Sequence, residues 1–225
     1  MAFYFFGKES PDTFSVIIGA GNGTNSYGPT LEYTNGSRDV YAILGCDNMW
    51  KTDSMGIPIY PPTTLPVIIH EFSHSFVNYL IYKNIDAFRE SGEKIFSFVK
   101  KEMDNKQVYP SIDGMLCEAL VRASVLKYAK DRNLENFFIK YLKEKDPNFD
   151  QSVFENQPLH DLLLHDLIQQ EKVQGFFWIE ELVAELDSYD KQRDIYPTLE
   201  SYIPKLVEAY KIWAENIQTT PPSNE

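Results

Sequence analysis

The spacing of apolar residues predicts strands in the N-terminal part of the chain. Residues 14–18 form a β-branched, apolar run, and residues 39–44 form a second run of the same kind. Before the second run, Asn35 and Gly36 follow the short segment Leu-Glu-Tyr at residues 31–33, and this dipeptide is typical of a tight hairpin turn. The pattern therefore predicts a small sheet that contains a hairpin.

From residue 65 onward the apolar pattern is helical almost to the end of the chain. Helices are predicted over residues 65–82, 84–105, 112–131, 133–144, 153–170, 175–190 and 198–217. We expect one α+β domain over residues 1–218, with strands and loops in 1–64, of which 45–64 is an irregular connection, and helices in 65–218. The tail, 219–225, is expected to be disordered.

Composition and charge narrow the classes of function. The 225 residues are 43% hydrophobic, which is enough to build a core, and the formal net charge is -12. Such an acidic chain, without a stripe of Lys and Arg, is not expected to bind nucleic acid. No apolar run reaches the roughly 18–20 residues that a membrane span needs. The two cysteines, Cys46 and Cys117, lack metal-ligand spacing; we expect free thiols, and a single disulfide is the alternative.

One short motif carries recognisable chemistry. His70, Glu71 and His74 form H-E-x-x-H in an uncharged, apolar stretch of the first predicted helix. Histidines four residues apart lie about 40° apart around a helix axis, so both imidazoles can reach one ion. Glu71 lies where it can act as general base on a water at that ion. The motif predicts one catalytic Zn²⁺ with His70 and His74 as ligands, and the alternative is a pair of hydrogen-bonded core histidines.

A catalytic zinc needs a third protein ligand. His160 and His165 are the other histidines, but the aspartates beside them are typical of a solvated helix face. Glu118 is the better candidate, because its carboxylate lies on an apolar helix face and needs a cation. Arg122, one turn further on, can supply that cation as an ordinary i to i+4 ion pair. If zinc is bound, Arg122 is expected to orient the carboxylate instead.

The H-E-x-x-H motif followed by the helical Glu118 resembles the gluzincin branch of the zincin metallopeptidases. Residues 70–78 and the later run Glu-Ala-Leu-Val-Arg-Ala are also similar to a bacterial family of presumed peptidases, catalogued as a domain of unknown function and usually extracytoplasmic. The interval between His74 and Glu118 is longer than in thermolysin-like enzymes, and Arg122 stands where those enzymes carry Asp.

The resemblance implies a zincin-like fold with the H-E-x-x-H helix at its centre, and hydrolysis of a peptide or protein substrate with Glu71 as base. It also implies an edge strand beside the cleft, for which residues 40–44 are the candidate; an ordinary core strand is the alternative. Two other functions stay open: a catalytically inactive zincin-like module that binds peptides or a protein partner, and a helical interaction protein with a chance motif. The residues leave oligomeric state and compartment open, and the resemblance favours a secreted or periplasmic location.

Overall fold

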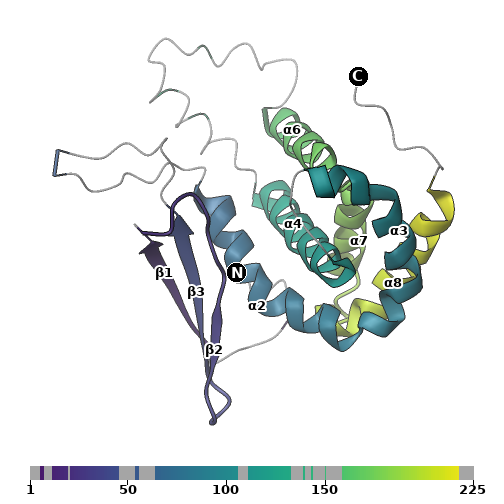
Figure 1. The fold of residues 1–225 in the computed structure, drawn as a ribbon, viewed down its shortest axis with the longest axis horizontal. Helices are drawn as coiled ribbons and strands as arrows, with labels where there is room; N and C mark the ends of the chain where they lie inside the picture. The colour runs from purple at the N-terminus through teal and green to yellow at the C-terminus, as the bar shows by residue number, and fades with distance from the viewer. Residues whose placement is uncertain are drawn as a thin grey trace. The chain divides into compact units, whose positions relative to one another are not determined.

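A small N-terminal sheet followed by six described helices gives the chain an α+β fold, as the sequence predicts (Figure 1). The computed structural model describes residues 6–7, 12–19, 21–45, 54–55, 64–105, 111–132, 139, 143, 150 and 159–217. The strands are β1 (Thr13–Gly19), β2 (Thr30–Glu32) and β3 (Arg38–Gly45). The helices are α2 (Thr64–Lys83), α3 (Ile85–Asn105), α4 (Ile112–Arg132), α6 (Leu159–Val173), α7 (Ile179–Lys191) and α8 (Leu199–Asn216).

The chain divides into two compact units, and the divisions fall between residues 9 and 10 and inside α2, α4 and α6. The sheet unit comprises Ser10–Ser75 and Tyr128–Asp166, and it contains the three strands and the N-terminal half of α2. The helical unit comprises Met1–Glu9, Phe76–Lys127 and Leu167–Glu225, and it contains α3, α7 and α8. The expectation of one domain over residues 1–218 stays a prediction.

The hairpin predicted at Asn35 and Gly36 joins β2 to β3. The two strands are antiparallel, and the N–H of Tyr33 donates a 2.9 Å hydrogen bond to the carbonyl of Ser37 across the turn. Gly36 has a φ of 81°, in the left-handed region that glycine adopts without steric cost. The local sequence signal for this hairpin is therefore confirmed.

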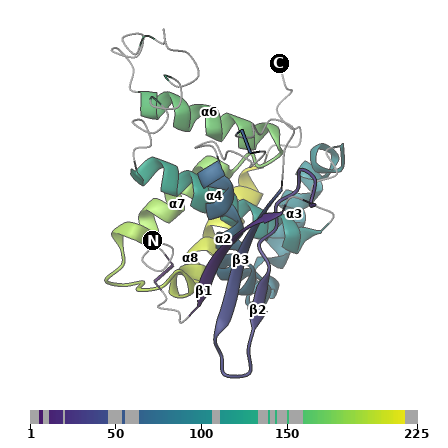
Figure 2. The same cartoon turned by 90° about the vertical axis from the view of Figure 1, so that its left-hand side faces the viewer.

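The sheet has the order β1-β3-β2, so β3 lies in the middle (Figure 2). β1 runs parallel to β3 on one side, and β2 runs antiparallel to it on the other. Val40, Ala42 and Leu44 of β3 are buried. These alternate residues share one face of the sheet, and that face packs into the core. The expectation that residues 40–44 form an edge strand is wrong, and the core-strand alternative is correct.

The sheet packs directly against the first half of α2. Phe14 of β1 meets Phe72 of α2 edge to face, with ring centroids 5.2 Å apart. Gly28, just before β2, lies so close to α2 that an added Cβ would be 2.2 Å from the carbonyl oxygen of Glu71. Its neighbour Tyr27 exchanges two backbone hydrogen bonds with β3, at 2.9 and 2.8 Å. Strand pairing and helix packing thus fix this crossing together.

Aromatic side chains form part of the core of the helical unit. Phe88 of α3 meets Tyr210 of α8 edge to face, with ring centroids 5.3 Å apart. Trp178 lies next to the same tyrosine, and its Nε1–H donates a 3.3 Å hydrogen bond to the Tyr210 hydroxyl. Such a partner offsets the cost of burying the polar ends of Trp and Tyr. The contacts join the N-cap of α7 to α8.

A glycine determines where α6 ends and α7 begins. Gly175 has a φ of 101°, and its N–H and that of Phe176 donate hydrogen bonds of 2.9 and 3.1 Å to carbonyls in the last turn of α6. These two bonds are the pattern of a Schellman helix end. The helix predicted over residues 175–190 therefore begins later, at Ile179, because the turn occupies the residues before it.

Several expectations fall on the gaps of the described chain. Most of the helix predicted over 133–144, most of the connection 45–64 and all of the tail 219–225 lie outside the described residues. Among the helices that are described, none combines the length and the apolar character that a membrane-spanning segment requires.

Replacing Gly28 by alanine is expected to lower the free energy of unfolding by about 1–3 kcal/mol, the usual cost of overpacking. The reason is steric, since the new Cβ meets the backbone of Glu71. Gly21→Ala is the matched control, because a Cβ added there has no neighbouring atom within 4 Å. Guanidinium unfolding followed by circular dichroism measures both variants. Equal unfolding midpoints for the two would show that the close crossing at Glu71 does not exist.

Candidate metal centre

Helix α2 presents both motif histidines toward a common point. It begins at Thr64 and has Pro66 in its first turn, where the missing N–H leaves no helical hydrogen bond unmade. His70 and His74 are half-buried, and their Nε2 atoms lie 3.2 Å apart with ring planes at 80°. Glu71 is buried, with 7% of its surface exposed. The 3.6-residue period of the helix thus produces the convergence that the motif predicts.

The separation of the two Nε2 atoms of His70 and His74 suits a shared metal ion. With zinc–nitrogen bonds of about 2.0–2.1 Å and tetrahedral angles, two ligand nitrogens lie about 3.3–3.4 Å apart. The observed 3.2 Å is within about 0.2 Å of that value. The same distance suits a hydrogen bond between neutral imidazoles, so a third ligand is needed to favour the metal.

Glu118 of α4 supplies the third potential ligand. His70, His74 and Glu118 each offer one ligand atom, and these atoms lie within 4.8 Å of one another. Two imidazole nitrogens and one carboxylate oxygen form a ligand set of catalytic zinc sites, in which a fourth position is left for water or substrate. Over the described part of the chain, no second cluster of three such side chains is close enough to hold an ion.

The other residues considered as ligands do not join this group. His165 lies exposed on α6, and the side chain of His160 lies outside the described residues. Cys117, next to Glu118, is a free buried thiol, as expected, whereas Cys46 is not described. Burial raises the pKa of Cys117 to about 12, with the nearby Asp113 and Glu118 carboxylates adding to the shift, so this thiol is neutral at physiological pH.

The predicted ion pair between Glu118 and Arg122 is present. Arg122 Nε lies 3.4 Å from Glu118 Oε2, and 19% and 13% of the two side chains are exposed. Arg122 makes a shorter contact with Glu171 of α6, at 2.6 Å from Nη1 to Oε2. The Phe176 ring lies under the guanidinium, 5.0 Å from its carbon to the ring centroid. The i to i+4 spacing in the sequence predicts the contact between Glu118 and Arg122. No nearby sequence pattern predicts the contact between Arg122 and Glu171, which are 49 residues apart.

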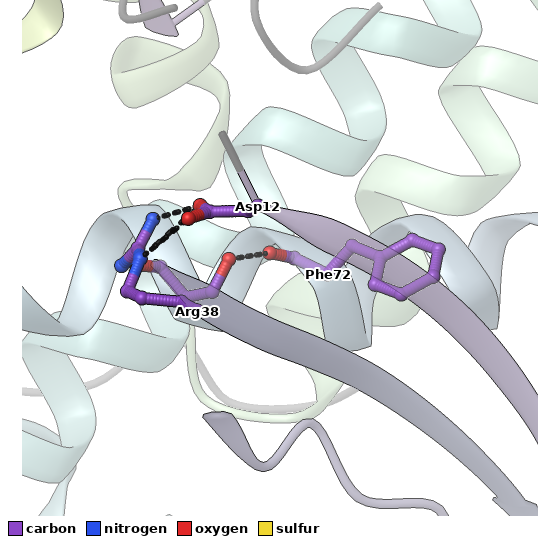
Figure 3. A network of polar contacts seen from close by, with 4 residues as sticks. Asp12, Arg38 and Phe72 are labelled. Atoms are coloured by element: carbon purple, nitrogen blue, oxygen red, sulfur yellow. Dashed lines mark hydrogen bonds and ion pairs between the residues drawn. The ribbon is translucent and has the colours of Figure 1, made fainter. Parts of the chain in front are cut away.

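A polar network fixes α2 to the sheet directly after the motif (Figure 3). Asp12 and Arg38 are neighbours because they come one residue before the first paired positions of the parallel strands β1 and β3. Arg38 Nε lies 3.1 Å from each carboxylate oxygen of Asp12, and Nη2 makes a further short bond to Oδ2. Arg38 Nη1 also donates a 3.2 Å hydrogen bond to the carbonyl of Ser75, the residue after His74.

The same network reaches one turn back along α2. The Ser75 hydroxyl donates a 2.7 Å hydrogen bond to the carbonyl of Phe72, which lies between the two histidines (Figure 3). The Asp12 side chain is fully buried and that of Arg38 is 20% exposed, so water screens this ion pair little. The position of the motif helix on the sheet therefore depends on a charge pair that no local sequence pattern reveals.

Asp12→Asn is expected to lower the free energy of unfolding by about 3 kcal/mol, near the lower end for removing one partner of a buried ion pair. Arg38 keeps some exposure, which reduces the cost of leaving its charge without Asp12. Asp86→Asn is the control, because it breaks the exposed 2.9 Å pair with Arg89 and should leave stability unchanged. Urea unfolding, which does not screen charges, gives both values. Equal effects of the two substitutions would contradict the anchoring role of Asp12.

Comparison with known proteins finds no significant match to this chain. No family model matches the chain, and neither the curated proteins nor the solved structures contain a significant match. Two features therefore point to a function: the motif in the sequence and the donor atoms that lie near it.

Proposed function

We propose that this chain is a zinc-dependent peptidase in which His70, His74 and Glu118 hold one Zn²⁺ and Glu71 is the general base. The observation that carries the proposal is the grouping of two imidazole nitrogens and a carboxylate oxygen within 4.8 Å of one another. Three such donors with an open fourth position are the ligand number and type of a catalytic zinc site.

Each motif residue has a distinct part in this chemistry. His70 and His74, one turn apart, hold the ion from one side, and Glu118 balances part of its charge. A bound zinc ion would supply Lewis acidity, which lowers the pKa of a water at the metal to about 7 and polarises a carbonyl group. Glu71 is close in sequence to both histidines but is not a ligand in this proposal. It accepts the proton of that water and passes it to the leaving amine.

The buried environment of Glu71 supports its part as base. Only 7% of its surface is exposed, so bulk water has little access to its side chain. A carboxylate that served only as a surface charge would lie on the exposed side of the helix. The choice of a peptide bond as the substrate comes from the resemblance to gluzincins.

Glu71→Gln tests the proposed mechanism, because glutamine keeps the shape of the side chain but cannot accept a proton. We expect this variant to retain one zinc per chain and to lose about 10²- to 10⁴-fold in turnover of a peptide library. Glu181→Gln on the exposed side of α7 is the matched control and should keep full activity. Zinc content is measured by mass spectrometry of protein purified without chelator, and cleavage by chromatography of the peptides.

The outcomes separate the proposed peptidase from its alternatives. Removing zinc with a chelator should abolish cleavage, and adding zinc back should restore it. Zinc bound to a wild-type protein that cleaves nothing would favour an inactive binding module. A wild-type protein that binds no zinc would favour a helical interaction protein with a chance motif.

A further inference from the structure

Arg122 lies between two carboxylates that come from different helices. One is Glu118, four residues before it on α4, and the other is Glu171 on α6. All three side chains are largely buried, with 13–20% exposed, so their interactions are weakened little by solvent. These three side chains carry one positive and two negative charges. The charge of Arg122 acts on both carboxylates, so the strength of its contact with Glu171 affects how strongly it interacts with Glu118.

The two contacts of Arg122 differ in length. Its Nη1 lies 2.6 Å from Glu171, at the short end of a charge-assisted hydrogen bond. Its Nε lies 3.4 Å from Glu118, longer than the usual N–H···O range of about 2.7–3.2 Å. Of these two contacts of Arg122, the one with Glu171 is therefore the stronger and the one with Glu118 is the weaker.

The end of α6 is built to keep Glu171 and Arg122 in this arrangement. The N–H of Phe176 donates a 3.1 Å hydrogen bond to the carbonyl of Glu171, as part of the turn that contains Gly175. The same turn places the Phe176 ring under the guanidinium of Arg122, 5.0 Å from its carbon. One turn therefore positions both the carboxylate and the ring that hold the arginine.

We propose that Glu171 is a positioning residue: by binding Arg122, it weakens the pull of that arginine on the Glu118 carboxylate, to which a metal ion would also bind. This inference rests on the proposed zinc site. Without Glu171, Arg122 can pair more closely with Glu118, and a carboxylate neutralised by arginine attracts a dication less. With Glu171 present, the three side chains keep a net charge of about −1, which favours a cation beside Glu118.

Glu171→Gln tests this role through zinc affinity. The variant should bind zinc about 10- to 100-fold more weakly than the wild type, the usual effect of changing an outer partner of a ligand. The double variant Arg122→Gln with Glu171→Gln should recover most of that loss, because the competing cation is gone. A merely structural role for Glu171 predicts no recovery, since the double change removes more contacts than the single one.

Zinc affinity is measured by competition with a chromophoric chelator, and circular dichroism of each variant checks the fold. Glu180→Gln is the matched control: it makes the same charge change and breaks a 2.7 Å pair with Lys172, but Glu180 is 61% exposed, and its zinc affinity should equal that of the wild type. If Glu171→Gln does not fold, Glu171→Asp takes its place, because it keeps the charge but moves it away from Arg122 and should also weaken binding.

Unchanged affinity in Glu171→Gln, or a double variant as weak as the single one, would overturn the role of Glu171 while leaving the zinc site itself in place. A wild-type protein that does not bind zinc would overturn both the site and this inference. The two failures are therefore distinguishable in one set of titrations.

Discussion

The proposed site depends on two imidazole nitrogens, those of His70 and His74, that lie 3.2 Å apart on one face of α2. At that distance the two nitrogens can share either a proton or a metal ion. Glu118 favours the metal, since a carboxylate among the same donors adds the negative charge that a dication needs. Within each unit, a polar network ties the helix that carries the proposed ligands to a neighbouring element.

Each of the two helices that carry the proposed ligands has one arginine that links it to a neighbouring element. Arg38 joins α2 to the sheet through Asp12 and the carbonyl of Ser75, and Arg122 joins α4 to α6 through Glu171. Arginine suits this task because its planar guanidinium stays charged and makes several directed hydrogen bonds at once. In a chain with a net charge of -12, the position of Arg122 between Glu118 and Glu171 also relieves the repulsion between these two carboxylates.

Local signals in the sequence predict much of the fold, whereas contacts between distant segments escape them. The hairpin at Gly36, the α+β class and the beginning of α2 follow from turn chemistry and periodicity within a few residues. The middle place of β3 depends on the parallel pairing of β1 with β3, which no local pattern encodes. The late start of α7 follows from the positive φ of Gly175, which apolar periodicity does not report.

The same division applies to the candidate site. His70, Glu71 and His74 are recognisable from their spacing alone, and Glu118 from a carboxylate on an apolar helix face. Asp12, Arg38 and Glu171 are not, because each acts through a partner at least 26 residues away. The most direct measurement is an anomalous-difference map from zinc-loaded crystals. We expect a single peak bonded to His70, His74 and Glu118 at about 2.0–2.2 Å. No peak at these side chains, or zinc bound by other residues, would contradict the proposed centre.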